Sequence, residues 1–303
     1  MTQFWLKIAA LAAFMVAPVM ASAQVSAEPR NGELVRLNPS NFWKVSQEAD
    51  LQVTDQVKIA DGLHSPTISP DGSRVVLSAL SKEPDQKSRL FQWNATSSSP
   101  ELIMEGVDVS NHVTWTDNDS FYVRERFAPF FEHGKKLNFK AEDRRATFRD
   151  RRTLHEDPVV VFDADDVIVM KYDNKLLAIS DVTVDRYSGP MVSSDQKYVV
   201  FSGLVTGVNL YDIRNNGVVF QDAKGSGPSF SPDGKYLVYT ETADDGHVLT
   251  RGDIIIFDIQ NKKRMKLSNP THEIRVQASL SRKADFIAWE NVNGESFKAR
   301  LNK

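Results

Sequence analysis

The chain has 303 residues, of which 41% are hydrophobic and 25% are charged, with a formal net charge of −3 at pH 7 and no cysteine. This composition is ordinary for a folded globular protein and excludes a disordered or fibrous chain. The lack of cysteine excludes a disulfide-stapled fold and a thioether-linked lipoprotein, so stability has to come from burial.

The N-terminus has the pattern of an export signal. Lys7 precedes an apolar run over residues 8–20, and Ala21-Ser22-Ala23 places small residues before Gln24. This predicts a secretory signal peptide over residues 1–23. An uncleaved anchor is the alternative, but the run is shorter than the roughly 20 apolar residues of a span and Pro18 interrupts it. Residues 24–50 follow as a leader, polar to about residue 45 and expected to have little structure.

A turn motif recurs along the rest of the chain. Residues 227–240 read Gly-Pro-Ser-Phe-Ser-Pro-Asp-Gly-Lys-Tyr-Leu-Val-Tyr-Thr, and residues 65–78 nearly repeat them. Pro presets φ, Asp can bond back to the backbone and Gly tolerates a positive φ, so each copy predicts two strands joined by a tight turn. Six copies of decreasing clarity open their turns at Ser69, Thr116, Phe162, Ser193, Ser231 and Ser281. Their mean spacing, (281 − 69)/5 or about 42 residues, is the period of a four-stranded propeller blade.

The two ends of the chain complement each other. Residues 51–60 alternate like the last strand of a repeat but precede the first full one, and residues 295–301 look like a third strand with no fourth. Pairing of residues 57–60 beside residues 297–301 would leave no open edge between the first and last repeats. The sequence therefore predicts an all-β fold, a six-bladed β-propeller over residues 51–303, closed by an N-terminal outer strand.

One segment departs from the repeat. Residues 124–152 contain ten Lys or Arg against five Asp or Glu, a local charge of +5, together with five phenylalanines. Arginine and aromatic residues are enriched where interfaces carry their binding energy, and loops on a rigid scaffold often carry recognition. The candidate partner-binding residues are Arg124, Arg126, Phe127, Phe130, Phe131, Lys135, Lys136, Arg144, Arg145 and Arg149. The alternative is an irregular outer hairpin with solvated charges and phenylalanines packed on its own blade.

The Ser-Pro-Asp-Gly turns at residues 69–72 and 231–234, and less closely residues 193–197, make the chain similar to the TolB-type propeller repeats of exported Gram-negative proteins. The resemblance covers about residues 52–301 and implies a six-bladed ring in the periplasm, acting mainly as a protein-binding platform. The α/β domain that precedes the propeller in TolB has no counterpart, because residues 24–50 are too few. Similar blades occur in peptidase and carbohydrate-lyase propellers, so the fold does not name a function.

Three histidines form a second candidate site. His64, His112 and His155 lie a few residues before the first strands of three consecutive blades, where such strands enter a central channel. Converging imidazoles could bind a divalent metal. Their offsets from the turn residues, 5, 4 and 7 positions, are unequal. The alternative is that each imidazole bonds a blade corner or faces solvent. The acidic cluster around Asp165 falls in a hairpin corner without the spacing of a calcium loop.

The sequence contains no Gly-x-Ser-x-Gly motif, phosphate-binding loop or dinucleotide fingerprint, so no cofactor is expected beyond a possible divalent metal. Two hypotheses follow. The first is a non-catalytic propeller that binds a protein or an anionic envelope component through residues 124–152 and the channel mouth. The second is a metal-dependent carbohydrate lyase or lactonase with its site at that mouth. Nucleic acid is disfavoured because the protein is acidic and exported, and no transmembrane span is expected after signal cleavage.

Overall fold

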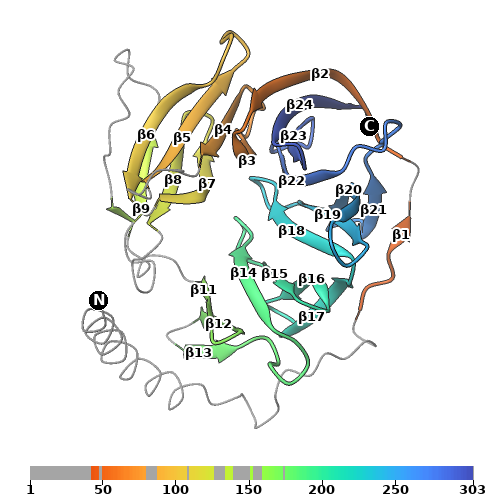
Figure 1. Ribbon diagram of the computed structural model, residues 1–303. Coiled ribbons are helices and arrows are strands. Elements are labelled where there is room, and N and C mark those ends of the chain that lie inside the picture. The colour runs from red at the N-terminus through yellow and green to blue at the C-terminus, as the bar shows by residue number, and fades with distance from the viewer. Residues whose placement is uncertain are drawn as a thin grey trace, which may run out of the picture.

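The computed structural model describes residues 42–47, 50–79, 87–107, 109–125, 134–138, 151–152, 159–172 and 175–302. The predicted signal peptide and most of the predicted leader lie outside these ranges. The described residues form strands and turns without a helix, and none therefore supplies the long apolar helix of a membrane span. Their strands make six sheets, which follow one another around a common centre (Figure 1).

The first three sheets take the chain to residue 178. The first sheet has the order β3 (His64–Ile68), β4 (Arg74–Ala79), β5 (Lys87–Asn94) and β6 (Glu101–Val107). The second has β7 (Val109–Asp117), β8 (Ser120–Glu125), β9 (Gly134–Asn138) and β10 (Arg151–Arg152). The third has three described strands, β11 (Val159–Ala164), β12 (Val167–Tyr172) and β13 (Lys175–Ala178).

The last three sheets contain the strands after residue 178, and the fifth and sixth of them also include an N-terminal strand. The fourth sheet has β14 (Tyr187–Val192), β15 (Tyr198–Gly203), β16 (Gly207–Asp212) and β17 (Gly217–Asp222). The fifth has β18 (Gly225–Phe230), β19 (Tyr236–Asp244), β20 (Leu249–Asp258) and β21 (Lys263–Lys266), with β1 (Ser46–Gln47) added outside β21. The sixth has β22 (Arg275–Leu280), β23 (Phe286–Asn291), β24 (Glu295–Asn302) and, as its outer strand, β2 (Gln52–Asp61).

The predicted pairing of the two chain ends is confirmed. Strand β2 runs antiparallel to β24, with Val57 opposite Lys298 and Lys58 opposite Phe297. The first and last sheets also touch at their inner strands, where the Ile68 amide donates to Ser279 Oγ at 3.0 Å. The first and sixth sheets are therefore neighbours in space.

The core lies between neighbouring sheets. Clusters of buried side chains fill the boundaries of the sixth sheet with the first, the first with the second, and the third, fourth, fifth and sixth in succession. Phe220 and Phe257, for example, stack across the fourth and fifth sheets with ring centroids 4.4 Å apart. The first, fourth, fifth and sixth sheets thus bury apolar residues on both faces, which is why their strands are nearly continuous apolar runs. Among the described residues, no such cluster joins the second sheet to the third.

Four of the six predicted hairpin turns are confirmed, those that open at Ser69, Ser193, Ser231 and Ser281. The other two predicted positions are wrong, because Thr116 lies within β7 and Phe162 within β11, whose turn follows at residues 165–166. In the clearest copy, Ser231 Oγ donates to Asp233 Oδ1 at 2.8 Å, and the Gly234 amide donates to the Ser231 carbonyl at 2.9 Å. Gly234 has φ +72°. In the degenerate copies Gln196 and Ala284 take this place, with φ of +57° and +50°. The turn geometry accounts for the motif without a ligand.

The end of the predicted leader is more ordered than the sequence indicated. The Trp43 amide donates to the Val219 carbonyl of β17 at 2.7 Å, and the indole packs edge-on against Tyr198 and stacks on Phe257. Three residues later the chain has joined the fifth sheet, where β1 runs parallel to β21. Residues 42–47 are therefore a strap across the outer edges of the fourth and fifth sheets.

Candidate functional site

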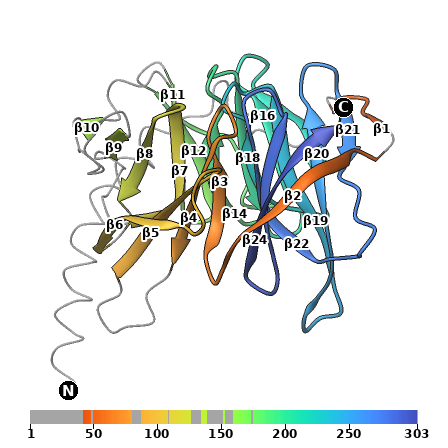
Figure 2. The ribbon, with the colours of Figure 1, turned by 90° about the horizontal axis from the view of Figure 1, so that it is seen from above.

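The two ends of the sheets carry different connections. Turns from first to second strands, such as residues 69–73 and 231–235, leave at one end, which we call the turn face. Turns from second to third strands, and the connections between sheets, leave at the other end, which we call the loop face. The long β19–β20 hairpin extends from the loop face, at the lower edge of Figure 2. A partner that approaches along the ring axis therefore meets one of two different surfaces.

Exposed apolar side chains gather on the loop face. Ten large hydrophobic residues of the described chain are exposed, and Val57 and Leu102 belong to the outer strands β2 and β6. Seven of the others lie in or next to loop-face connections: Val182, Val184, Leu204, Val205, Val248, Leu249 and Val292. Tyr172 lies at the turn-face end of β12, because the other end of that strand, at Asp166, meets the loop-face start of β14, where the Tyr187 amide donates to the Asp166 carbonyl at 2.9 Å. This uneven distribution is unusual, because exposed apolar residues are normally scattered singly over a surface.

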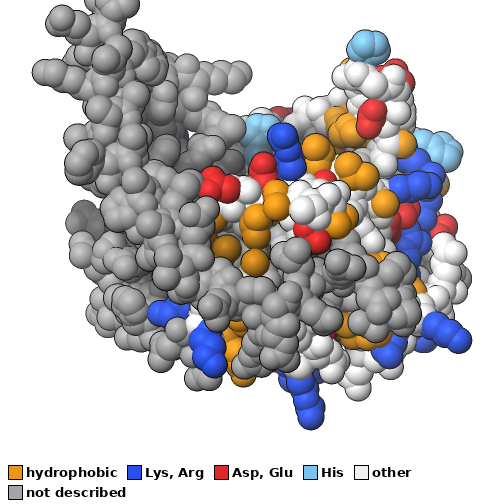
Figure 3. All heavy atoms as spheres, turned by 90° about the horizontal axis from the view of Figure 1, so that it is seen from below, with side chains coloured by type: hydrophobic (Ala, Val, Ile, Leu, Met, Phe, Trp, Pro, Cys, Tyr) orange, Lys and Arg blue, Asp and Glu red, His pale blue; other side chains and the backbone are white. Residues whose placement is uncertain are grey.

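Four of these residues form what we call the aliphatic patch. Val182 and Val184 belong to the connection from β13 to β14 and are 52% and 49% exposed. Leu204 and Val205 form the turn from β15 to β16 and are 78% and 71% exposed. Hydrophobic side chains are exposed among polar ones on the side of the molecule that Figure 3 shows. Such a cluster is the kind of surface that marks a protein–protein contact.

A buried carboxylate holds the two loops of the patch together. Asp185 Oδ2 accepts from the amides of Val205 and Thr206 at 2.9 and 2.7 Å, and from Thr206 Oγ1 at 2.8 Å. The Leu204 amide donates to the carbonyl of Arg186 at 3.0 Å. Burial raises the pKa of the Asp185 carboxyl, but these hydrogen bonds outweigh it and hold the pKa below the usual value. The carboxylate is thus charged at neutral pH and fixes the backbone of the patch.

Two further features make the patch rigid. Asp181 Oδ1 accepts from the amide and the hydroxyl of Thr183 at 2.9 and 2.6 Å, which orders the stretch that carries Val182 and Val184. A β-carbon at Gly203 would overlap the Thr206 hydroxyl and the Asp185 carboxylate, so glycine is required for the loops to approach. The aliphatic side chains therefore point outward from a preorganised backbone, and binding would lose little conformational entropy.

The predicted basic and aromatic segment is described only in part. Arg124 belongs to β8, and Lys135 and Lys136 belong to β9, so their backbone positions in the second sheet are known. The remaining predicted contact residues lie outside the described residues: Arg126, Phe127, Phe130, Phe131, Arg144, Arg145 and Arg149. Because residues 126–133 join a second strand to a third, they are attached to the sheet at the loop face, the same face as the patch.

Of the three predicted metal ligands, only His64 has a described side chain. Its Nδ1 lies 2.6 Å from Glu290 Oε1, and Glu290 Oε2 accepts from the Ser65 amide at 2.9 Å. His112 belongs to β7, but its side chain, like the whole of His155, lies outside the described residues. No three His, Asp or Glu side chains of the described chain are grouped as metal ligands would be. Asp165 is exposed in the β11–β12 hairpin turn, as predicted.

No known protein-family model and no curated protein matches the chain. Solved structures that it resembles include the C-terminal WD40 domain of Sif2, with a TM-score of 0.35 and 13% identity over 80% of this chain and 70% of that domain. Another is the β-propeller domain of Cps50 (Swd1) from Myceliophteria thermophila, with a TM-score of 0.43 and 7% identity over 83% of this chain and all of that domain. Resemblance at this level carries no functional information.

The class of the protein rests instead on its own architecture. Along the chain, successive sheets form in which neighbouring strands follow one another in sequence. These sheets pack face to face and surround a common centre (Figure 1). This is the architecture of a β-propeller repeat protein.

Proposed function

We propose that the chain is an exported, closed six-bladed β-propeller of the TolB type that binds a protein partner through its loop face and catalyses no reaction. The observation that carries this proposal is the aliphatic patch of Val182, Val184, Leu204 and Val205, exposed on loops that a buried carboxylate makes rigid. Closure of the ring is supported by the pairing of β2 with β24 and by the contact between the first and sixth sheets. Location in the periplasm follows from the signal peptide pattern.

The basic and aromatic segment would supply the rim of the same interface. Interfaces commonly combine an apolar centre with a polar, charged surround. Residues 124–152, which carry a charge of +5, would favour a partner with an acidic surface or an anionic envelope component beside the patch. Lys135→Glu with Lys136→Glu should then slow association and weaken its dependence on salt, while the aliphatic patch still determines the dissociation rate.

Site-specific photocrosslinking tests the proposal. A benzophenone amino acid at position 204 should yield a crosslinked species of one defined mass in cells, whereas the same probe at the exposed turn-face residue Ser73 should not. Val205→Glu added to the position-204 probe should remove that species while leaving the melting temperature unchanged. No crosslink from position 204, or equal crosslinks from both faces, would refute a loop-face partner.

A metal-dependent lyase or lactonase is the second candidate function. The contact of His64 Nδ1 with Glu290 favours it, because a metal-ligating histidine commonly bonds a carboxylate through its other nitrogen. His64 Nε2, with His112 and His155, would hold the metal. Metal analysis of the purified protein decides between the candidates. A stoichiometric divalent metal that is lost in His64→Ala supports the enzyme, and its absence eliminates this candidate.

A further inference from the structure

The aliphatic patch is bordered on one side by the β11–β12 turn of the third sheet. The Tyr187 amide, three residues after Val184, donates to the Asp166 carbonyl of that turn at 2.9 Å. The Arg186 guanidinium lies beside the same residue, with its Nε 3.7 Å from Asp166 Oδ2. The turn is therefore held against the connection that carries Val182 and Val184, and a partner that covers the patch also meets the turn.

Three exposed aspartates make this border acidic: Asp163, Asp165 and Asp166. Val161 of β11 packs in the apolar cluster shared with the fourth sheet. Because side chains alternate along a strand, Asp163, two residues further, lies on the same face of the third sheet. Within the described part of the chain, Arg186 lies near Asp166, whereas no basic side chain pairs with Asp163 or Asp165. Three carboxylates beside one guanidinium leave this border with a net charge of −2.

The geometry of the turn does not require these charges. Ala164 lies opposite Val167, so Asp165 and Asp166 are the two loop residues of the hairpin, with φ of +51° and +66°. Positive φ at both residues is typical of a two-residue type I′ turn, in which Asn-Gly is preferred. Two adjacent aspartates repel each other there, so they stabilise the hairpin less than Asn-Gly would. Their carboxylates, like the exposed aliphatic side chains beside them, are not explained by folding.

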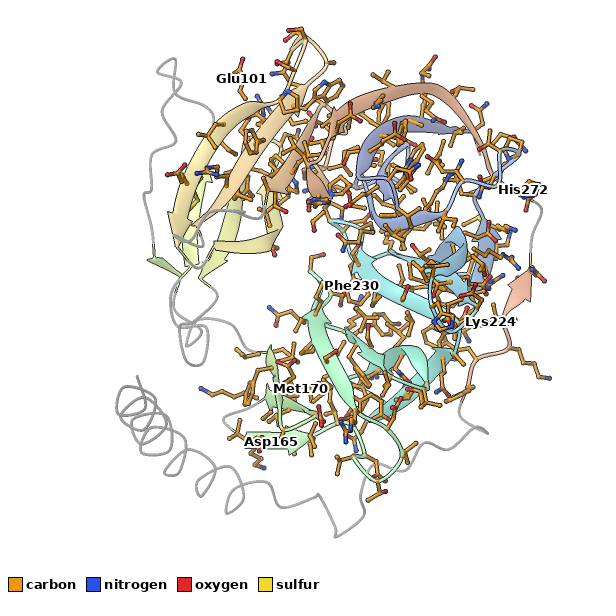
Figure 4. The ribbon with its side chains drawn as sticks, in the orientation of Figure 1. Glu101, Asp165, Met170, Lys224, Phe230 and His272 are labelled. Carbon is orange, nitrogen blue, oxygen red and sulfur yellow. The ribbon has the colours of Figure 1, made fainter. Side chains whose placement is uncertain are left out.

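The opposite border of the patch carries a positive charge. The connection from β17 to β18 lies next to the patch turn, because Gln221 Nε2 donates to the Thr206 carbonyl at 3.3 Å. This connection includes Lys224, which is exposed. Figure 4 labels Asp165 and Lys224 and shows them on either side of the fourth sheet, whose connections carry the patch. The charge of the surface thus changes from negative to positive across the patch.

We propose that the partner docks on the patch with an amphipathic protein segment that is basic on one side. Its apolar residues cover Val184 and Leu204, and its lysine or arginine residues face Asp163 and Asp165. Charged groups around an apolar centre fix the orientation of a partner and speed its association. This inference rests on the proposed function, because the segment occupies the same patch. Acidic groups of the same partner would lie further round the ring, beside the basic segment of the second sheet.

Photocrosslinking from position 204 also tests the charge of the partner. Asp163→Asn with Asp165→Asn removes two charges, and asparagine tolerates the positive φ of position 165, so the melting temperature should not fall. The crosslinked species should decrease by about threefold or more, because the cations of the partner lose their counter-charges. Asp50→Asn with Asp55→Asn is the matched control, since both residues are exposed away from the patch and Asp55 also has a positive φ, +52°. The control should leave the yield unchanged.

Mass spectrometry of the crosslinked species identifies the segment that covers the patch. The peptide joined to residue 204 should come from another protein and contain more Lys and Arg than Asp and Glu. An acidic peptide, an unchanged yield in Asp163→Asn with Asp165→Asn, or an equal decrease in the control would overturn this inference, although a loop-face partner would stand. A crosslink to residues 124–152 of this chain, within one copy or between two, would show that its own basic segment covers the patch, and would overturn it as well. The absence of any crosslink from position 204 would instead remove the proposed function itself.

Discussion

In both the turn face and the aliphatic patch a carboxylate fixes a turn, but the turns of the first expose polar residues and those of the second expose aliphatic ones. In the turn at residues 231–234, Asp233 accepts a hydrogen bond from Ser231, which is only two residues away, so the interaction is local. In the patch, Asp185 bonds Val205 and Thr206 some 20 residues away, so it joins two separate loops. Both backbones are satisfied by polar groups. The aliphatic side chains of the patch are therefore not needed to form its turns, and their exposure calls for another explanation.

The two regions should differ most in how much the free energy of unfolding falls when the carboxylate is removed. Asp185→Ala leaves the amides of Val205 and Thr206 without their acceptor in a buried position, and it should lower the free energy of unfolding by about 3 kcal/mol. Asp233→Ala breaks a local, partly exposed bond and should cost about 1 kcal/mol. Urea denaturation of both variants measures the difference. Equal losses would show that Asp185 does not hold the loops together.

Replacement of Gly203 should also lower the free energy of unfolding, but by less. Gly203→Ala pushes a β-carbon into the Asp185 carboxylate and the Thr206 hydroxyl, and it should cost about 2 kcal/mol by separating the loops. Gly227→Ala is the matched control, because nothing lies within 4 Å of its β-carbon and only its φ of +57° opposes the change, at about 1 kcal/mol. Thermal unfolding of the two variants compares them. A Gly203→Ala variant as stable as the unaltered protein would contradict the close approach.

Acid should weaken the patch through Asp185. Its pKa in the folded protein lies below the unfolded value, so the carboxylate contributes stability above about pH 4, and this contribution is lost as the pH falls through the folded-state pKa. The difference in unfolding free energy between the unaltered protein and Asp185→Asn should accordingly be constant above about pH 5 and shrink in more acidic solution. A difference that stays constant down to pH 2 would mean that Asp185 is not the titrating group.

The sequence was sufficient for the repeated parts of this molecule. Regular spacing of turn residues such as Ser69 and Ser231 predicted the hairpins, and alternation near both chain ends predicted the pairing of β2 with β24. These features depend on the chemistry of neighbouring residues and on the spacing of the repeats, and both can be read directly from the sequence. Two degenerate copies of the motif also form the turn, because Gln196 and Ala284 adopt the positive φ that glycine has in the clearer copies.

Features that depend on contacts between distant residues were missed. Asp185 is an unremarkable loop residue in the sequence, and its role appears only when the turn at residues 204–206 is folded against it. One signal was available: Leu204 and Val205 stand between two glycines, where the Ser-Pro-Asp-Gly turns are polar. Trp43 was assigned to an unstructured leader because the surrounding residues are polar. Its partners, Val219 and Phe257, are far away in the chain.

The smallest expected effect on stability is the most informative about function. Leu204→Ser with Val205→Ser removes the most exposed half of the aliphatic patch, and the free energy of unfolding should change by less than about 0.5 kcal/mol, because exposed side chains bury little on folding. Leu210→Ser, in the adjoining strand and fully buried, is the control and should cost about 3 kcal/mol or more. Urea denaturation measures both. If the double variant were as damaging as Leu210→Ser, the patch would belong to the core. If it is neutral, the two aliphatic side chains are dispensable for the fold and available to a partner.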